Sequence, residues 1–233
     1  MLKILLDKSP LHFKYYSENP IKESAAMRFG TAFHKYVLEG ESFEKEYIVE
    51  PNIDKRTTLG KKTWLTFVQN NASKKWITED NMKLIKEMYK VITNNKHFNL
   101  MNNCLKEHIH LWENKSRDML CKCRLDAVNF EKEYIIDIKT TRDASPKVFE
   151  DIIVKNKYHM QAAYYLDGTE LKDYYIFAIE KSPPYGMCIY KLDKSIIQEG
   201  RNEYVKGLAI MKEIKVRGEA GYNNDKIKTL KWN

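Results

Sequence analysis

The sequence predicts an α/β domain with a central mixed β-sheet flanked by helices. Three observations favour this class: helical and strand periodicities alternate along the chain, 43% of its 233 residues are hydrophobic, and only 9 are glycine and 6 proline. Such a composition is typical of a soluble globular protein. Because no repeat, low-complexity tract or linker divides the chain, we expect one domain over residues 1–233.

The first forty residues have helical patterns. Ser24 is placed to cap a helix from Ala25 to Leu38, whose apolar residues recur at helical spacing, and Gly40 is expected to end it. A short strand, Tyr47–Val49, and a polar loop are expected within residues 41–60.

Residues 64–89 have helical periodicity that is interrupted near residues 70–75, which predicts two helices. From Cys104 onward the period changes to two. Glu107 begins an alternating stretch, and residues 120–129 and 134–139 follow as further strands. This part of the chain is therefore expected to form a three-stranded meander.

The last third of the chain is expected to add a helix, two strands and a final helix. The helical pattern covers residues 151–166 and then returns from residue 195 to about residue 216. Between them, residues 174–180 and 187–192 are rich in β-branched and aromatic side chains, which favours strands.

The net charge of +8 and the isoelectric point near 9.1 fit a protein that contacts phosphate backbones. Apolar runs are too short for a membrane span, and the N-terminus lacks a signal-peptide pattern, so we expect a cytoplasmic protein, in the host cytoplasm if the gene is phage-borne. The four cysteines do not form a disulfide framework.

The most informative local feature is a pair of carboxylates with a lysine. Asp126 lies on one expected strand, and Asp137 and Lys139 lie two residues apart on the next. Residues two apart in a strand share a face, so Asp137 and Lys139 should point the same way while Ile136 and Ile138 enter the core. Two converging carboxylates are costly unless a cation neutralises them.

Oxygen ligands of this kind suit Mg²⁺ or Mn²⁺, which would promote hydrolysis of a phosphodiester, with Lys139 orienting the attacking water. The alternative is an ordinary ion pair on an exposed strand. The neighbouring residues Ile135, Ile136 and Ile138 favour a buried strand, where charges persist when they are paired or bind metal.

Five ordered strings extend the pattern over most of the chain: FGTAFHKYVLEG at residues 29–40, EPNIDKRTTLGKKTWLTF at 50–67, CKCRLDAV at 121–128, IIDIKTTRDAS at 135–145 and YHMQAAYY at 158–165. Together they resemble the nuclease domain of exonuclease VIII (RecE), a PD-(D/E)xK (restriction-endonuclease-like) fold related to lambda exonuclease and the RecB-type nucleases.

The resemblance implies roles for individual positions. His34, Asp126, Asp137 and the backbone carbonyl of Ile138 would hold the metal, and Glu107 would bind it directly or through water. Asp126, Asp137 and Lys139 would be catalytic, together with Gln161 and Tyr165, which match the Q-x-x-x-Y element of these nucleases. From the residues alone, a lone histidine on an apolar helix face or a Gln and Tyr four apart are more often packing residues, and Tyr164 competes with Tyr165.

Basic residues recur in the matched strings and are candidates for gripping DNA phosphates: Arg28, Arg56, Lys61, Lys122 and Arg124. The family resemblance further implies an exonuclease that degrades linear double-stranded DNA from 5′ ends, a RecT-like single-strand annealing partner and a homo-oligomeric ring. The cysteine spacing leads us to expect no iron-sulfur cluster. The alternatives are an endonuclease or Cas4-like nuclease on the same fold, and a DNA-binding or assembly module without activity.

Overall fold

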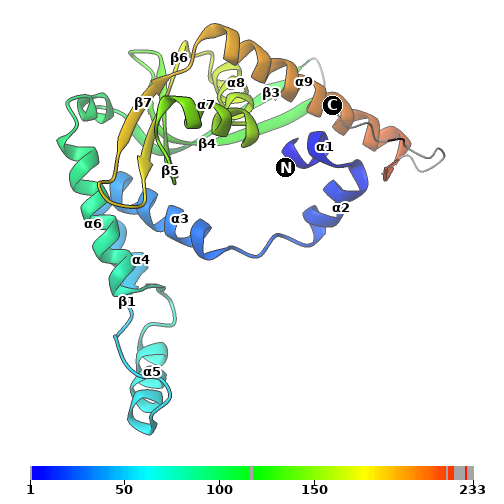
Figure 1. The fold of residues 1–233 in the computed structure, drawn as a ribbon. Coiled ribbons are helices and arrows are strands. Elements are labelled where there is room, and N and C mark those ends of the chain that lie inside the picture. The colour runs from blue at the N-terminus through cyan, green and yellow to red at the C-terminus, as the bar shows by residue number, and fades with distance from the viewer. Residues whose placement is uncertain (1, 116–117, 219, 223–228, 230–233) are drawn as a thin grey trace.

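A five-stranded mixed sheet lies at the centre of the structure, a computed structural model that describes residues 2–115, 118–218, 220–222 and 229. Its strands occur in the order β3-β4-β5-β6-β7. The bounds are β3 Leu105–Asn114, β4 Met119–Asn129, β5 Tyr134–Thr141, β6 Asp173–Glu180 and β7 Met187–Lys191. The predicted α/β class with a central mixed sheet is confirmed (Figure 1).

The predicted meander is present, since β3, β4 and β5 pair as antiparallel neighbours. The pair β5–β6 is parallel, with Asp137 opposite Ile176, and β7 closes the order antiparallel to β6. A parallel pair needs a crossover connection. Here the crossover consists of helices α7 Pro146–Lys155 and α8 Tyr158–Thr169.

Helices cover both faces of the sheet. On one face, α7, α8 and the long helix α9 Lys194–Arg217 enclose an apolar cluster that includes Leu125, Ile135 and Tyr174. On the other face, α3 Ala25–Leu38 and α6 Glu79–Asn94 enclose a second cluster with Ile136 and Ile138. Because β5 is covered on both sides, a polar group on it is shielded from water.

The N-terminal helices α1 Leu2–Asp7 and α2 Pro10–Glu18 pack near α9 (Figure 1). Helix α3 starts as predicted, because the side chain of Ser24 accepts a hydrogen bond from the Met27 N–H. Gly40, however, does not end this helix. Glu39 caps α3, and Gly40 begins a further helix, α4 Gly40–Glu46, which precedes the expected strand.

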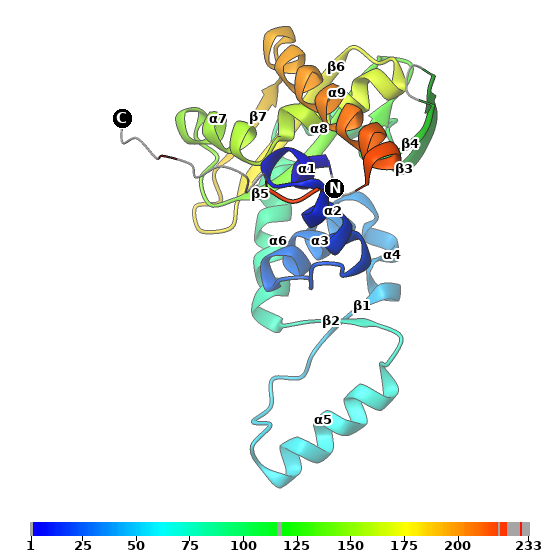
Figure 2. The same cartoon turned by 90° about the vertical axis from the view of Figure 1, so that its right-hand side faces the viewer.

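Residues 51–76 form a protrusion that extends away from the five-stranded sheet, at the end opposite α9 (Figures 1 and 2). It contains α5 Thr58–Asn70, which follows a loop and is joined to the next strand by a turn at residues 71–74. At its base the predicted strand β1 Tyr47–Val49 pairs in parallel with β2 Lys75–Ile77, which sequence reasoning had not identified. We call residues 51–76 the arm.

The single helix predicted for residues 151–166 is wrong, since α7 and α8 are separate. Lys157 between them has a left-handed backbone (φ 58°), which breaks the helix. Its ammonium lies 2.7 Å from a carboxylate oxygen of Glu203 on α9, an ion pair that fixes the turn. A short 3₁₀ helix, η1 Phe98–Met101, precedes β3. No helix within the described ranges is long and apolar enough to cross a membrane.

Candidate active site

Strand β5 presents Asp137 and Lys139 on one face, as the two-residue period predicts. Ile136 and Ile138 are fully buried on the opposite face, against α3 and α6. Asp137 is only 3% exposed, and its Oδ2 lies 2.7 Å from the Lys139 Nζ. The strand therefore places an acid and an amine together in a buried position.

Asp126 joins this group from β4. The β4–β5 ladder ends at the pair Ala127↔Ile136, so Asp126 is the first residue of β4 beyond it. Its Oδ2 accepts a hydrogen bond of 2.8 Å from the backbone N–H of Ile138 and lies 3.3 Å from Nδ1 of His34 on α3. These contacts connect α3, β4 and β5 at one point.

Gln161 reaches the same point from α8. Its Nε2 donates to Asp137 Oδ1 at 2.8 Å and to the hydroxyl of Tyr174 at 3.1 Å. The Lys139 Nζ lies 4.7 Å from the ring centroid of Tyr158, also on α8. The first turn of α8 thus fixes both the carboxylate and the amine of β5.

The charges in this cluster are strongly coupled. Burial opposes the ionisation of Asp126, but His34 and Lys139 outweigh it and hold the pKa of Asp126 below its usual value. Burial, reinforced by the charge of Asp126, raises the pKa of Asp137 although Lys139 acts against it. For Lys139 and His34, burial is outweighed by the carboxylates, so that both pKa values are raised.

Glu107 lies opposite Asp126, at the register position between the pairs Lys106↔Ala127 and His108↔Leu125. It has a left-handed backbone (φ 51°), which is unfavourable for a residue with a side chain. Burial raises its pKa against the effect of Arg124, whose Nε lies 2.9 Å from Glu107 Oε2. Glu107 is thus near the cluster but paired with Arg124.

No three His, Cys, Asp or Glu side chains of the described residues are arranged to hold a metal ion together. The predicted side-chain ligands lie in two adjoining pairs instead: His34 contacts Asp126, and Asp137 contacts the predicted catalytic residue Lys139. The donor set nevertheless fits a divalent cation in kind. Asp137 Oδ2 is buried without a hydrogen bond of good geometry, and the Ile138 carbonyl, like its N–H, faces the Asp126 edge of β5.

The comparison with protein families is decisive for the fold. The model of a PDDEXK-like domain of unknown function (DUF3799) matches residues 2–232. The chain belongs to this PDDEXK-like family. The predicted restriction-endonuclease-like core is confirmed. Asp126, Asp137 and Lys139 stay the predicted residues of the motif in the family's name.

One solved structure agrees on the fold. A candidate exonuclease from Eubacterium rectale superposes with a TM-score of 0.59 at 14% identity, over 91% of this PDDEXK-like domain and 79% of that chain. A phage-related exonuclease from Haemophilus somnus gives a TM-score of 0.38 at 11% identity, over 79% of this chain and 93% of that one. No curated protein matches the sequence.

The PDDEXK-like domain brings together most of the residues singled out from the sequence. His34 contacts Asp126, and Lys139 and Gln161 contact Asp137; the backbone N–H of Ile138, next to Asp137, joins the two groups through its hydrogen bond to Asp126. Tyr165 lies behind them, its ring centroid 6.4 Å from that of Tyr174. The basic candidates are dispersed. Exposed Lys122 and Arg124 are on β4, exposed Arg28 is on α3, and exposed Arg56 and Lys61 belong to the arm.

Sequence reasoning missed Tyr158 and Tyr174. Tyr158 had a usable signal, because Tyr158, Gln161 and Tyr165 are spaced three and four residues apart on one helix face. Tyr174 had none, since it looked like any aromatic residue of a strand. Its buried hydroxyl accepts the hydrogen bond that holds Gln161 toward Asp137.

Proposed function

We propose that this protein is a divalent-metal-dependent nuclease that hydrolyses phosphodiester bonds of double-stranded DNA. The observation that carries the proposal is the buried cluster of His34, Asp126, Asp137, Lys139 and Gln161, assembled from α3, β4, β5 and α8. Burial, reinforced by the negative charge of Asp126, raises the pKa of Asp137, and a cation beside the two carboxylates would favour the ionised form.

His34, Asp126, Asp137 and the Ile138 carbonyl would hold Mg²⁺ or Mn²⁺, with Glu107 as a further oxygen donor after release from Arg124. The bound ion would supply a Lewis acid for the phosphodiester and lower the pKa of the attacking water.

Side chains of the protein would position the reacting groups. Lys139, held by Asp137 and the Tyr158 ring, provides a buried positive charge beside the scissile phosphate. Gln161 holds Asp137 in orientation through its 2.8 Å hydrogen bond, and Tyr174 in turn holds Gln161. Tyr165, behind them, completes the packing of this helix face against the site.

We propose further that the enzyme is an exonuclease that degrades linear duplexes from 5′ ends and leaves 3′ single strands for a RecT-like annealing protein. The support is the resemblance of the five sequence strings to the exonuclease VIII family, together with the description of one protein of similar fold, from Eubacterium rectale, as a candidate exonuclease. The same resemblance supports a homo-oligomeric ring as the processive form. Lys122 and Arg124 would bind the phosphates next to the site.

The test is digestion of linear duplex DNA labelled separately at its 5′ and 3′ ends, beside closed circular DNA. Wild type, Lys139→Ala and the matched control Lys206→Ala are compared with Mg²⁺, with Mn²⁺ and with EDTA. Lys206 is an exposed residue of α9, away from the site. We expect metal-dependent loss of the 5′ label, intact circles, and a rate for Lys139→Ala that is lower by roughly a hundredfold to a thousandfold.

Each other result has a defined meaning. Cleavage of closed circular DNA would show that the enzyme is an endonuclease. Loss of the 3′ label before the 5′ label would show that degradation starts at 3′ ends. If folded wild-type protein cleaves no DNA with either metal, the proposed nuclease activity is refuted and a DNA-binding module is the remaining interpretation. Equal rates for Lys139→Ala and Lys206→Ala would remove Lys139 from the mechanism.

A further inference from the structure

The arm, residues 51–76, concentrates positive charge. It contains six lysine and arginine residues and one acid, which gives a net charge of +5 in 26 residues, whereas the entire chain of 233 residues has +8. The cations are Lys55, Arg56, Lys61, Lys62, Lys74 and Lys75, and the acid is Asp54. Charge of a single sign on a protruding element indicates a polyanionic partner.

Helix α5 of the arm lacks the packing that stabilises helices of this length. Gly60 is its only buried residue, while Leu59 and Leu65 are 75% and 60% exposed. An isolated helix of about 13 residues is marginal in water, because most helical stability comes from tertiary packing. A partner that covers α5 would therefore stabilise it.

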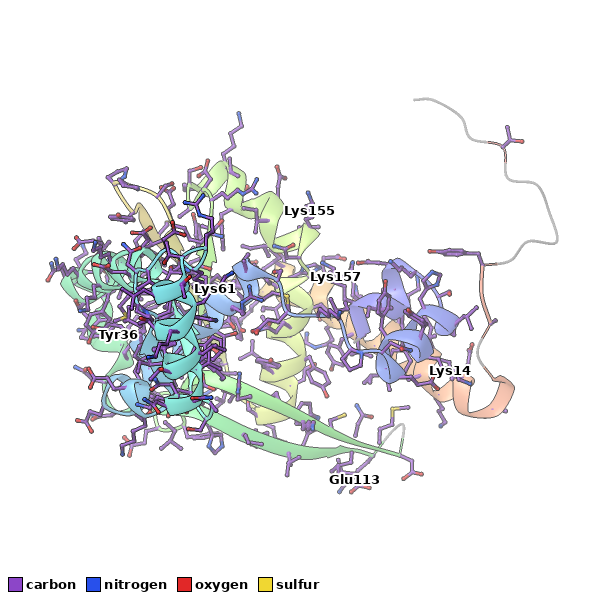
Figure 3. The ribbon with its side chains drawn as sticks, turned by 90° about the horizontal axis from the view of Figure 1, so that it is seen from below. Lys14, Tyr36, Lys61, Glu113, Lys155 and Lys157 are labelled. Carbon is purple, nitrogen blue, oxygen red and sulfur yellow. The ribbon has the colours of Figure 1, made fainter. Side chains whose placement is uncertain are left out.

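The arm nevertheless has internal packing of its own. The rings of Trp64, Phe67 and Trp76 pack together, with centroids 5.2 to 5.9 Å apart, and the Lys55 Nζ lies 3.3 Å from the centroid of Trp64. Gly60 packs so tightly that a Cβ atom there would be 2.0 Å from the backbone oxygen of Asp54. The start of α5, where Lys61 and Lys62 follow Gly60, is thereby held against the backbone of the preceding loop. Figure 3 looks along the arm from below and labels Lys61 on α5.

A groove of about 740 Å³ connects the base of the arm to helix α3. Arg28 of α3 lines it together with Lys74, Lys75 and Trp76 from the arm's end. Two acidic residues also line the groove, and both have partners. Glu23 accepts a hydrogen bond from the Thr31 hydroxyl, and a carboxylate oxygen of Glu50 lies 3.4 Å from the Lys55 Nζ. Since α3 also carries His34, the same helix contributes to the groove and to the candidate active site.

We propose that the arm is a clamp for the DNA backbone that binds the duplex outside the active site, through Lys61 and Lys62 on α5 and through Arg28 and Lys75 in the groove. The inference rests on the proposed function, because it takes DNA as the ligand. A second copy of this chain is a poorer occupant, since it would bring its own net charge of +8 against the arm.

The experiment measures binding of a fluorescently labelled blunt duplex by anisotropy, in EDTA so that no hydrolysis occurs, across a series of salt concentrations. Wild type is compared with Lys61→Ala/Lys62→Ala and with Lys206→Ala/Lys212→Ala, which removes the same charge from exposed positions of α9. Lys61→Arg/Lys62→Arg tests whether charge rather than lysine packing matters. Circular dichroism and light scattering accompany each variant.

Each lysine–phosphate contact contributes a factor of about 8 to affinity at about 0.1 M monovalent salt through counterion release. Loss of both contacts should therefore weaken binding about sixtyfold and reduce the slope of log affinity against log salt by about 2. The α9 control and the arginine variant should bind like wild type.

Equal binding by Lys61→Ala/Lys62→Ala and by the α9 control would overturn the clamp, as would a wild type that binds no duplex. A change of molecular mass in the arm variant with unaltered DNA affinity would assign the arm to contacts between copies and would also overturn it. The proposed nuclease is tested separately. If wild type degrades no DNA with any metal but binds it through the arm, the enzyme fails and the clamp stands.

Discussion

The contact between α8 and α9 gives a quantitative prediction at Gly200. A Cβ atom at this position would lie 2.1 Å from the backbone oxygen of His159 and 2.4 Å from its carbonyl carbon. Ordinary contact begins near 3.4 Å, so Gly200→Ala requires the two helices to separate by about 1.3 Å. Backbone atoms cannot rotate away, so the separation has to be taken up by the packed interface.

The free energy follows from two opposing effects. Alanine is favoured over glycine within a helix by about 1 kcal/mol. A separation of this size forfeits much of the dispersion energy along the interface, and overpacking of a dense core costs typically 1–3 kcal/mol and occasionally more. We expect Gly200→Ala to destabilise the protein by about 2 kcal/mol net, and to weaken activity because α8 carries Gln161 into the site.

Gly207 on the same helix is the matched control. A Cβ atom there would lie 3.4 to 3.8 Å from side-chain atoms of Leu2, which is ordinary contact. Gly207→Ala should therefore be neutral or stabilising by up to about 1 kcal/mol. Urea denaturation followed by circular dichroism measures both variants. If Gly200→Ala is as stable as Gly207→Ala, the close approach of α9 to the backbone of α8 is refuted.

Three further predictions concern single side chains. Gln161→Ala should lower the cleavage rate by about tenfold to a hundredfold, because Asp137 loses the hydrogen bond that orients it, while the free energy of unfolding changes by less than about 1 kcal/mol. An unaltered cleavage rate would contradict the positioning role of Gln161. Asp167 is bound by Arg201 through two 2.7 Å hydrogen bonds, which with Tyr204 lower its pKa despite burial. Asp167→Asn should therefore cost about 1.5–3 kcal/mol at neutral pH. The difference should vanish as the pH falls through the lowered folded-state pKa of Asp167, and a pH-independent difference in urea denaturation would disprove it. Burial raises the pKa of Cys123 to about 11, so iodoacetamide should label it slowly at pH 8 and quickly in urea, as mass spectrometry can show; rapid labelling of the native protein would exclude this burial.

Much of the fold could be predicted because the local patterns agree with it. The alternation around Asp137 predicted which residues of β5 enter the core, and both Ile136 and Ile138 are fully buried as expected. Ser24 capped α3 as predicted. In these cases a short-range rule, the strand period or the cap, acts in the same direction as the tertiary packing.

The remaining features depend on contacts between distant residues. Helical periodicity continues across Lys157, so only its left-handed backbone and its ion pair with Glu203 reveal the break between α7 and α8. The sequence also predicted a convergent set of ligands, but not that Lys139 would pair with Asp137 within that set. Side-chain pairing among buried charges follows from their three-dimensional arrangement, which spacing alone does not determine.

The crossover between the parallel strands β5 and β6 has a consequence during biosynthesis. His34 and Gln161 are 127 positions apart in the chain, yet His34 contacts Asp126 and Gln161 contacts Asp137 in the same cluster. Contacts over such separations form late in folding, because their loop-closure entropy has to be overcome first. The complete cluster therefore cannot exist on a nascent chain until α8 has left the ribosome, and a product truncated before α8 would lack Gln161 altogether.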